Sequence, residues 1–173
     1  MRFLLLILFI VSSLYSEEVK IGIFAKHNLT ELEIELADNA RIFYLGKDRT
    51  LEKGRWKVKL KEDKLYFTNT KIQGEHILIR SNEVFTITTL SNNKWLSRSY
   101  KGNLELYAKH NRILLALTLP LEEYVSSSTY SELGELLFDK TMTENSKHTL
   151  IASQEIVIRT YIQNEKQRHK NEP

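Results

Sequence analysis

The sequence predicts an α+β protein, with mostly antiparallel β-strands in the N-terminal two-thirds and two helices after them. Short segments of alternating apolar and polar residues recur up to residue 119. Gly, Asn, Asp and Ser residues separate these segments, as expected for turns. After Pro120 the period of the apolar residues lengthens to that of a helix. The length of 173 residues suits one domain, or a small domain with a short additional unit.

Strict alternation is clearest in two segments. Residues 31–36 place Leu32, Ile34 and Leu36 on one face. Residues 55–61 place a second apolar set on one face (Trp56, Val58 and Leu60) and a basic set on the other (Arg55, Lys57, Lys59 and Lys61). Further strands are predicted at residues 19–24, 41–45, 64–68, 75–80, 84–90, 102–108 and 113–119.

The basic face of residues 55–61 has two interpretations. Its cations could follow an anionic wall polymer, or they could form a solvated face that is partly paired with Glu31, Glu33 and Glu35 of another strand. The two tryptophans, Trp56 and Trp95, also have two interpretations, because an aromatic residue in a strand either packs in the core or stacks on a sugar.

Two helices are predicted in the last third of the chain. The first spans about 120–133, because Pro120 suits a first turn and Glu122 and Glu123 favour the positive end of the helix dipole. Gly134 is its predicted stop. The second spans about 146–167 and carries a broad apolar set. Residues 164–173 are polar and basic, and they are predicted to be a disordered tail.

Residues 1–16 have the layout of a secretory signal peptide. Arg2 precedes nine consecutive apolar residues, and small residues follow up to Ser16. The chain has no cysteine, which excludes disulfides and thiolate chemistry and suits export into a bacterial cell envelope. The 25 basic and 22 acidic residues give a net charge of +3, too small to indicate nucleic acid as a partner.

Three sequence blocks carry a resemblance to a known family. They are Tyr100-Lys101-Gly102-Asn103-Leu104-Glu105, then Leu119-Pro120-Leu121-Glu122-Glu123-Tyr124-Val125 with Ser131-Glu132-Leu133, and then Gln154 with Arg159-Thr160-Tyr161. In order and spacing these blocks resemble the SpoIID/LytB family, the stage II sporulation protein D and amidase enhancer domain. The resemblance divides the chain into a signal peptide (1–16), a variable β-rich portion (17–97), a partial SpoIID/LytB-like domain (98–163) and a tail (164–173).

The resemblance implies a role at bacterial peptidoglycan. No cofactor is expected. Enhancer members stimulate an N-acetylmuramoyl-L-alanine amidase, and sporulation members are lytic transglycosylases that cleave glycan strands. For the second role the resemblance makes Glu132 the catalytic residue, as one carboxyl group can protonate the leaving oxygen and then deprotonate the attacking 6-hydroxyl. Tyr124, Ser131 and Arg159 would bind substrate.

Alternatives remain for this site and for the whole chain. Arg159 could instead pair with Glu122 or Glu123 as a structural clamp. The expected function is glycan binding or amidase enhancement. The alternatives are a transglycosylase that uses Glu132 and a degenerate, truncated remnant. His110, His148 and His169 lack the spacing of paired metal ligands, so no metal site is expected.

Overall fold

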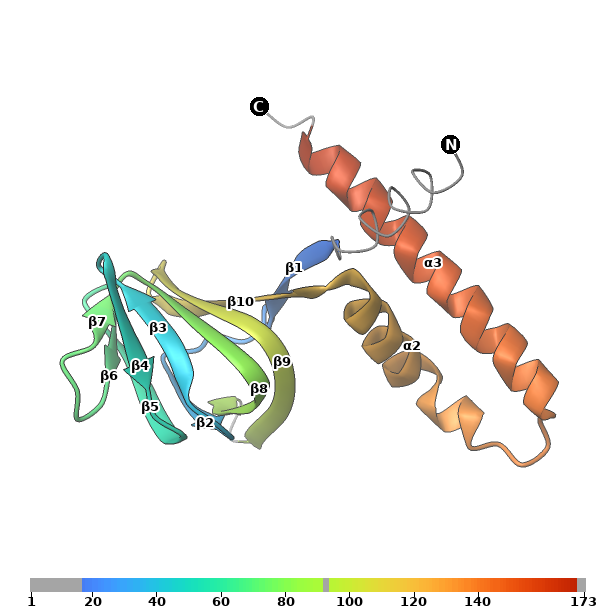
Figure 1. Ribbon diagram of the computed structural model, residues 1–173, viewed down its shortest axis with the longest axis horizontal. Helices are drawn as coiled ribbons and strands as arrows, with labels where there is room; N and C mark the ends of the chain where they lie inside the picture. Colours follow the sequence, from blue (N-terminus) through green and yellow to red (C-terminus); the bar gives the residue numbers. More distant parts are fainter. Residues whose placement is uncertain (1–16, 92–93, 171–173) are drawn as a thin grey trace, which may run out of the picture. The chain divides into compact units, whose positions relative to one another are not determined.

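The computed structural model describes residues 17–91 and 94–170, and it confirms the α+β class. The chain forms two compact units: residues 18–119 form a sheet unit, and residues from Pro120 onward, together with Glu17, form a helical unit (Figure 1). The signal peptide expected at residues 1–16 lies outside the described residues. The boundary expected at 97/98 from the family resemblance falls inside a strand, and the compact units divide at Leu119 instead.

The sheet unit contains ten strands in the described residues. They are β1 (Glu18–Ile23), β2 (Glu31–Leu36), β3 (Ala40–Tyr44), β4 (Lys47–Leu51), β5 (Gly54–Lys61), β6 (Lys64–Phe67), β7 (Gln73–Gly74), β8 (His76–Ser91), β9 (Lys94–Lys109) and β10 (Arg112–Pro120). All the pairings with a defined register are antiparallel.

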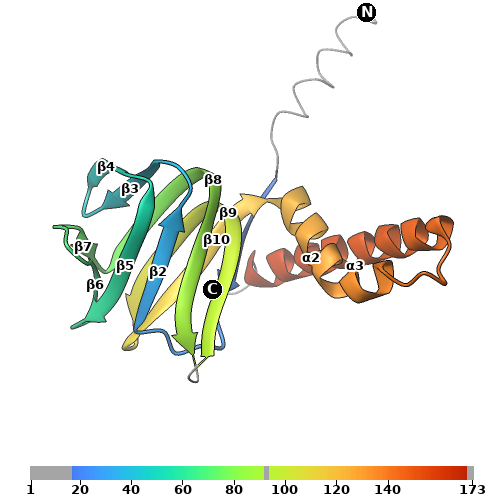
Figure 2. The same ribbon diagram turned by 90° about the horizontal axis from the view of Figure 1, so that it is seen from below.

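Strand β8 organises the sheet because it is long enough to have two neighbours on one side. Residues 77–80 pair with β3, and residues 85–88 pair with β2. The main path runs β1-β10-β9-β8-β2-β5-β6-β7, with β3 and β4 off it (Figure 2). The sheet curls around an apolar core, whose largest fully buried side chains include Phe67, Phe85, Ile34, Ile42 and Ile87.

The two alternating segments pair as neighbours. In the register of β2 and β5, Glu31 faces Lys59, Glu33 faces Lys57 and Glu35 faces Arg55. The apolar residues of β2 are buried on the opposite face (Leu32, Ile34 and Leu36). A one-residue slip would bury the charges, so this pattern fixes the register.

One irregularity joins two predicted strands into one. Segments 75–80 and 84–90 are parts of β8, and the register shifts between Ser81 and Phe85. The Ser81 hydroxyl donates to the Glu83 carbonyl oxygen (2.9 Å) and accepts from the Glu83 N–H (3.3 Å). These local bonds satisfy polar groups where the ladder is interrupted, so the segment forms a bulge rather than a turn.

The helical unit contains α2 (Leu121–Leu137) and α3 (Glu144–Lys170). Both are longer than predicted. Gly134 does not end α2, since two leucines continue the helix beyond it. The prediction of a disordered tail is wrong up to Lys170. No Gly or Pro interrupts this segment, and the helix continues through it. An ion pair between Arg168 and Glu165 (2.9 Å) supports this last part of α3.

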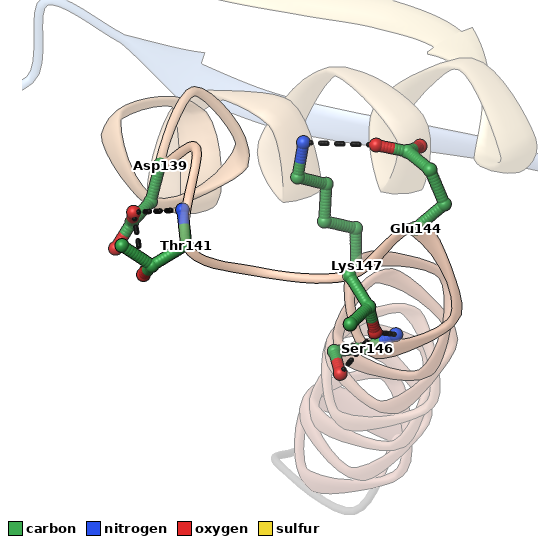
Figure 3. A network of polar contacts seen from close by, with 6 residues as sticks. Asp139, Thr141, Glu144, Ser146 and Lys147 are labelled. Carbon is green, nitrogen blue, oxygen red and sulfur yellow. Dashed lines mark hydrogen bonds and ion pairs between the residues drawn. The ribbon is translucent and has the colours of Figure 1, made fainter.

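Side-chain caps define the connection between the two helices (Figure 3). The Asp139 carboxylate accepts hydrogen bonds from the backbone N–H (2.8 Å) and hydroxyl (2.7 Å) of Thr141. Thr143 then caps α3, as its hydroxyl accepts from the N–H of Ser146 (3.2 Å). Lys147 also pairs with Glu144 (3.0 Å). Capping at Thr143 explains why α3 begins two residues before the predicted start.

The start of α2 has a different partner. Pro120 makes no side-chain cap, and the carbonyl oxygen of Glu17 accepts the N–H of Leu121 (2.7 Å) instead. The carboxylate of Glu17 pairs with Lys166 of α3. Glu17 therefore contacts both helices of the unit.

Candidate functional site

Glu132 lies beside the buried stripe of α2. This stripe contains every fourth residue, namely Leu121, Val125, Thr129 and Leu133. Glu132 directly precedes the last of them and is exposed. Its Oε2 atom accepts a hydrogen bond from Nε2 of Gln154 on α3. The second and third blocks of the family resemblance therefore contact each other here.

Arg159 makes the second contact between these blocks. Its Nε atom lies 3.2 Å from Oε1 of Glu122, and its Nη2 atom lies 2.6 Å from Oε2. Its Nη1 atom donates to Glu155 of the same helix (3.4 Å). The hydrogen bond from Arg159 lowers the pKa of Glu122 and raises that of Arg159 itself. Arg159 thus contacts Glu122 as a clamp between helices.

The structure does not bring the four predicted site residues to one point. At 100° per residue, Gln154 and Arg159 lie on opposite sides of the buried Ile158. On the first side Gln154 binds Glu132, and on the second side Arg159 binds Glu122. Tyr124 and Ser131 are two turns apart on α2, partly exposed and exposed respectively, and neither forms a side-chain hydrogen bond to another described residue.

The surroundings of Glu132 differ from those of a general acid. A carboxyl group that protonates a leaving oxygen near neutral pH needs an apolar or crowded pocket to hold its proton. Glu132 is exposed instead, and an amide donor contacts its carboxylate.

A polar cluster on the sheet unit was missed by sequence reasoning. Glu105 of β9, with 15% of its side chain exposed, lies 2.7 Å from Lys20 of β1 and 3.1 Å from Nε2 of His76 on β8. Tyr107 donates to the same carboxylate and stacks on His76, with ring centres 4.4 Å apart. Lys20 also donates to the Tyr107 hydroxyl (3.0 Å). We call these four residues the Glu105 cluster.

The charges of the Glu105 cluster stabilise one another. Burial raises the pKa of Glu105, but hydrogen bonds from Lys20 and Tyr107 outweigh it, so the net pKa lies below the ordinary value. The hydrogen bond to Glu105 raises the pKa of Lys20, with a further contribution from Tyr107. Glu105 belongs to the first block of the resemblance. Lys20 and Tyr107 are far apart in the sequence, and they come into contact because only β10 separates β1 from β9 in the sheet.

The basic face of β5 is paired with acids, as one of its two interpretations predicted. Glu31 lies 3.2 Å from Lys57 and 3.3 Å from Lys59. Arg55 lies 3.3 Å from Glu35 and 3.9 Å from Glu33. Hydrogen bonding to Lys57 is the largest cause of the lowered pKa of Glu31. These pairs neutralise cations that an anionic polymer would need.

Three general findings complete the description. In residues 17–91 and 94–170, no three His, Asp or Glu side chains are grouped so that they could hold a metal ion. None of the helices in this part of the chain is long and apolar enough to span a bilayer. Comparison with protein-family models, curated proteins and solved structures finds no match to the chain.

Proposed function

We propose that this chain is an exported bacterial cell-wall protein of the SpoIID/LytB type, which binds peptidoglycan glycan strands and enhances an N-acetylmuramoyl-L-alanine amidase without cleaving glycan itself. The order and spacing of the three sequence blocks support the family. The signal-peptide layout of residues 1–16 supports a location in the cell envelope, in the periplasm or at the outer face of the cytoplasmic membrane.

The exposed position of Glu132 is the observation that favours a non-catalytic role. The transglycosylase alternative needs this carboxyl group in a pocket that favours its protonated form. Glu132 is instead exposed beside Gln154, and Arg159 is committed to Glu122. The second and third blocks of the resemblance thus contribute contacts that hold α2 against α3.

Exposed apolar side chains on the helical unit support a protein partner. Phe138 is 86% exposed, and four other large side chains on these helices are more than half exposed: Tyr130, Ile156, Val157 and Tyr161. A contiguous patch of exposed apolar side chains is typical of a surface that binds another protein, and these five residues are the candidates for such a patch. In an enhancer, that protein is the amidase.

The test combines the exported protein, purified peptidoglycan and the amidase of the same organism. We expect faster release of peptides by the amidase and no anhydro-sugar products in mass spectra. Glu132→Gln should keep the stimulation, whereas Phe138→Ser combined with Tyr161→Ser should reduce it several-fold.

Two outcomes would contradict the proposal. Anhydro-sugar products that disappear in Glu132→Gln would identify a transglycosylase. A folded protein that neither binds peptidoglycan nor stimulates the amidase would support the degenerate remnant.

A further inference from the structure

The distal part of the β8–β9 hairpin presents two distinct faces. On β8, Phe85, Ile87 and Thr89 point inward and are buried. The alternate residues point outward and pair across the hairpin: Thr86 with Ser99, Thr88 with Ser97 and Leu90 with Trp95. This outward face continues onto β2, where Glu33 is paired with Thr88 and Glu35 with Thr86.

Trp95 is largely exposed to solvent instead of packing in the core. Trp95 is 72% exposed and Leu90 opposite it is 49% exposed, whereas Phe85, Ile87 and Thr89 on the inward face of β8 are buried. The other tryptophan, Trp56, is partly exposed and donates its indole N–H to the Glu52 carbonyl oxygen (2.8 Å). Most of the surface of Trp95 is therefore accessible to a ligand.

Polar groups continue the outward face beyond this indole. The next cross-strand pair is Thr88 with Ser97 (3.0 Å), and the pair after it is Thr86 with Ser99 (2.9 Å). Beside them is a depression of about 250 Å³, whose lining includes Glu31, Glu33, Lys57, Thr88, Leu90 and Trp95. We call this depression and its rim the Trp95 platform.

We propose that the Trp95 platform binds a neutral sugar ring of a β-linked, N-acetylated glycan strand. The apolar C–H face of the ring stacks on the indole of Trp95. The carboxylates of Glu31 and Glu33 accept hydrogen bonds from the sugar hydroxyls, and Thr88 and Ser97 supply groups that both donate and accept.

The balance of charges favours a sugar over a polyanion or an apolar protein surface. Lys57 and Lys59 already neutralise Glu31, and Arg55 is shared between Glu35 (3.3 Å) and Glu33 (3.9 Å). The platform thus offers hydrogen-bonding groups with little net charge. Its apolar part consists of two side chains among charged and hydroxyl groups, which suits a ring with one apolar face and polar edges.

This inference rests on the proposed function and deepens it, because it names where the sheet unit would bind glycan. The two can fail separately. The amidase assay depends on the helical unit, whereas the platform is tested by glycan binding alone.

The presence of only two tryptophans gives a direct optical test. In a Trp56→Phe variant of the exported protein, Trp95 is the sole indole. Titration with chitin oligosaccharides of three to six rings, the probe for N-acetylated glycan, should give a saturable change in its fluorescence. Trp95→Ala should weaken co-sedimentation with purified peptidoglycan at least tenfold, whereas Trp95→Phe should keep part of the affinity and Trp56→Phe nearly all of it.

Circular dichroism spectra and sedimentation velocity of each variant complete the test. Because Trp95 is largely exposed, Trp95→Ala should leave the spectrum and unfolding transition unchanged. The platform is wrong if Trp95→Ala binds peptidoglycan as tightly as the parent, even where amidase stimulation persists. It is also wrong if the parent is a dimer that this variant dissociates, since the occupant would then be a second copy.

Discussion

Gly102 illustrates how a single position in a family-like block can be determined by packing. Its φ is +123°, and a Cβ atom placed there would lie 2.5 Å from the Thr118 carbonyl oxygen and 3.2 Å from Cβ of Leu119. Both groups belong to β10, the neighbour of β9. Only glycine permits this backbone conformation and this close approach together. The glycine of the first block therefore has a structural explanation that does not depend on function.

A glycine pair tests this explanation. Gly102→Ala should lower the free energy of unfolding of the sheet unit by about 1–3 kcal/mol from its backbone conformation alone, measured by urea titration with tryptophan fluorescence. Gly134 lies within α2 with open space around its Cβ position. Gly134→Ala should therefore stabilise that helix by about 1 kcal/mol, measured by circular dichroism at 222 nm. Equal effects of the two changes would contradict the packing explanation.

At the scale of elements, the strands with one buried face were predictable and those without were not. The alternation of β2 and β5 also contained the complementary charges that set their register. Strand β4 was missed because Lys47 to Thr50 are all exposed, so no alternation marks it. The bulge at Ser81 looked like a chain reversal because its polar residues are those that turns use.

The helix ends followed different rules. Thr143 caps α3 through its hydroxyl, a signal that was present in the sequence but overlooked. Gly134 was read as a stop, but a glycine is tolerated inside a helix when the residues after it favour helix.

The clamp between α2 and α3 gives a prediction of pH dependence. In the folded state the pKa of Glu122 lies below its ordinary value of 4.5 because Arg159 donates to it. The pair should therefore stabilise the helices fully above about pH 4.5, and the effect should be lost as pH falls through the lower folded pKa. We expect the helical signal at 222 nm to decrease on acidification over this range.

Arg159→Lys should weaken the acid dependence, because an ammonium group cannot replace the bidentate contact. Arg168→Lys is the matched control, since Arg168 pairs with Glu165 of its own helix. The clamp would be excluded as the cause if the parent and Arg159→Lys titrate alike.

At the scale of the whole molecule, the sequence predicted the succession of sheet and helices but not the composition of a site. Glu122 and Glu132 belong to the second block, and Gln154 and Arg159 belong to the third. The pair of Arg159 with Glu122 was one alternative stated from the sequence. The pair of Gln154 with Glu132 was not, because it required the packing of α2 on α3. The Glu105 cluster required strands at opposite ends of the sheet unit's sequence to lie near each other. Such contacts are set by tertiary packing, which no local pattern encodes.

The two units should differ in how far each folds alone. Residues 18–119 contain most of the buried apolar side chains, whereas on the described helices the buried ones are Leu121, Val125, Leu133 and Ile158. Expressed alone, residues 18–119 should keep a cooperative urea transition with the midpoint of the full chain. Residues 120–170 alone should lose most of their helicity, as isolated helices are marginal in water. A sheet fragment without a cooperative transition would refute this division.

Under the proposed export, the contacts of Glu17 depend on where the signal peptide is cut. Removal of residues 1–16 would leave Glu17 as the first residue of the secreted chain. That residue provides the acceptor for the N–H of Leu121 and the carboxylate that pairs with Lys166. A peptidase that cut one bond later would remove both contacts, so under the proposed export the position of that cleavage would decide whether the helices keep them.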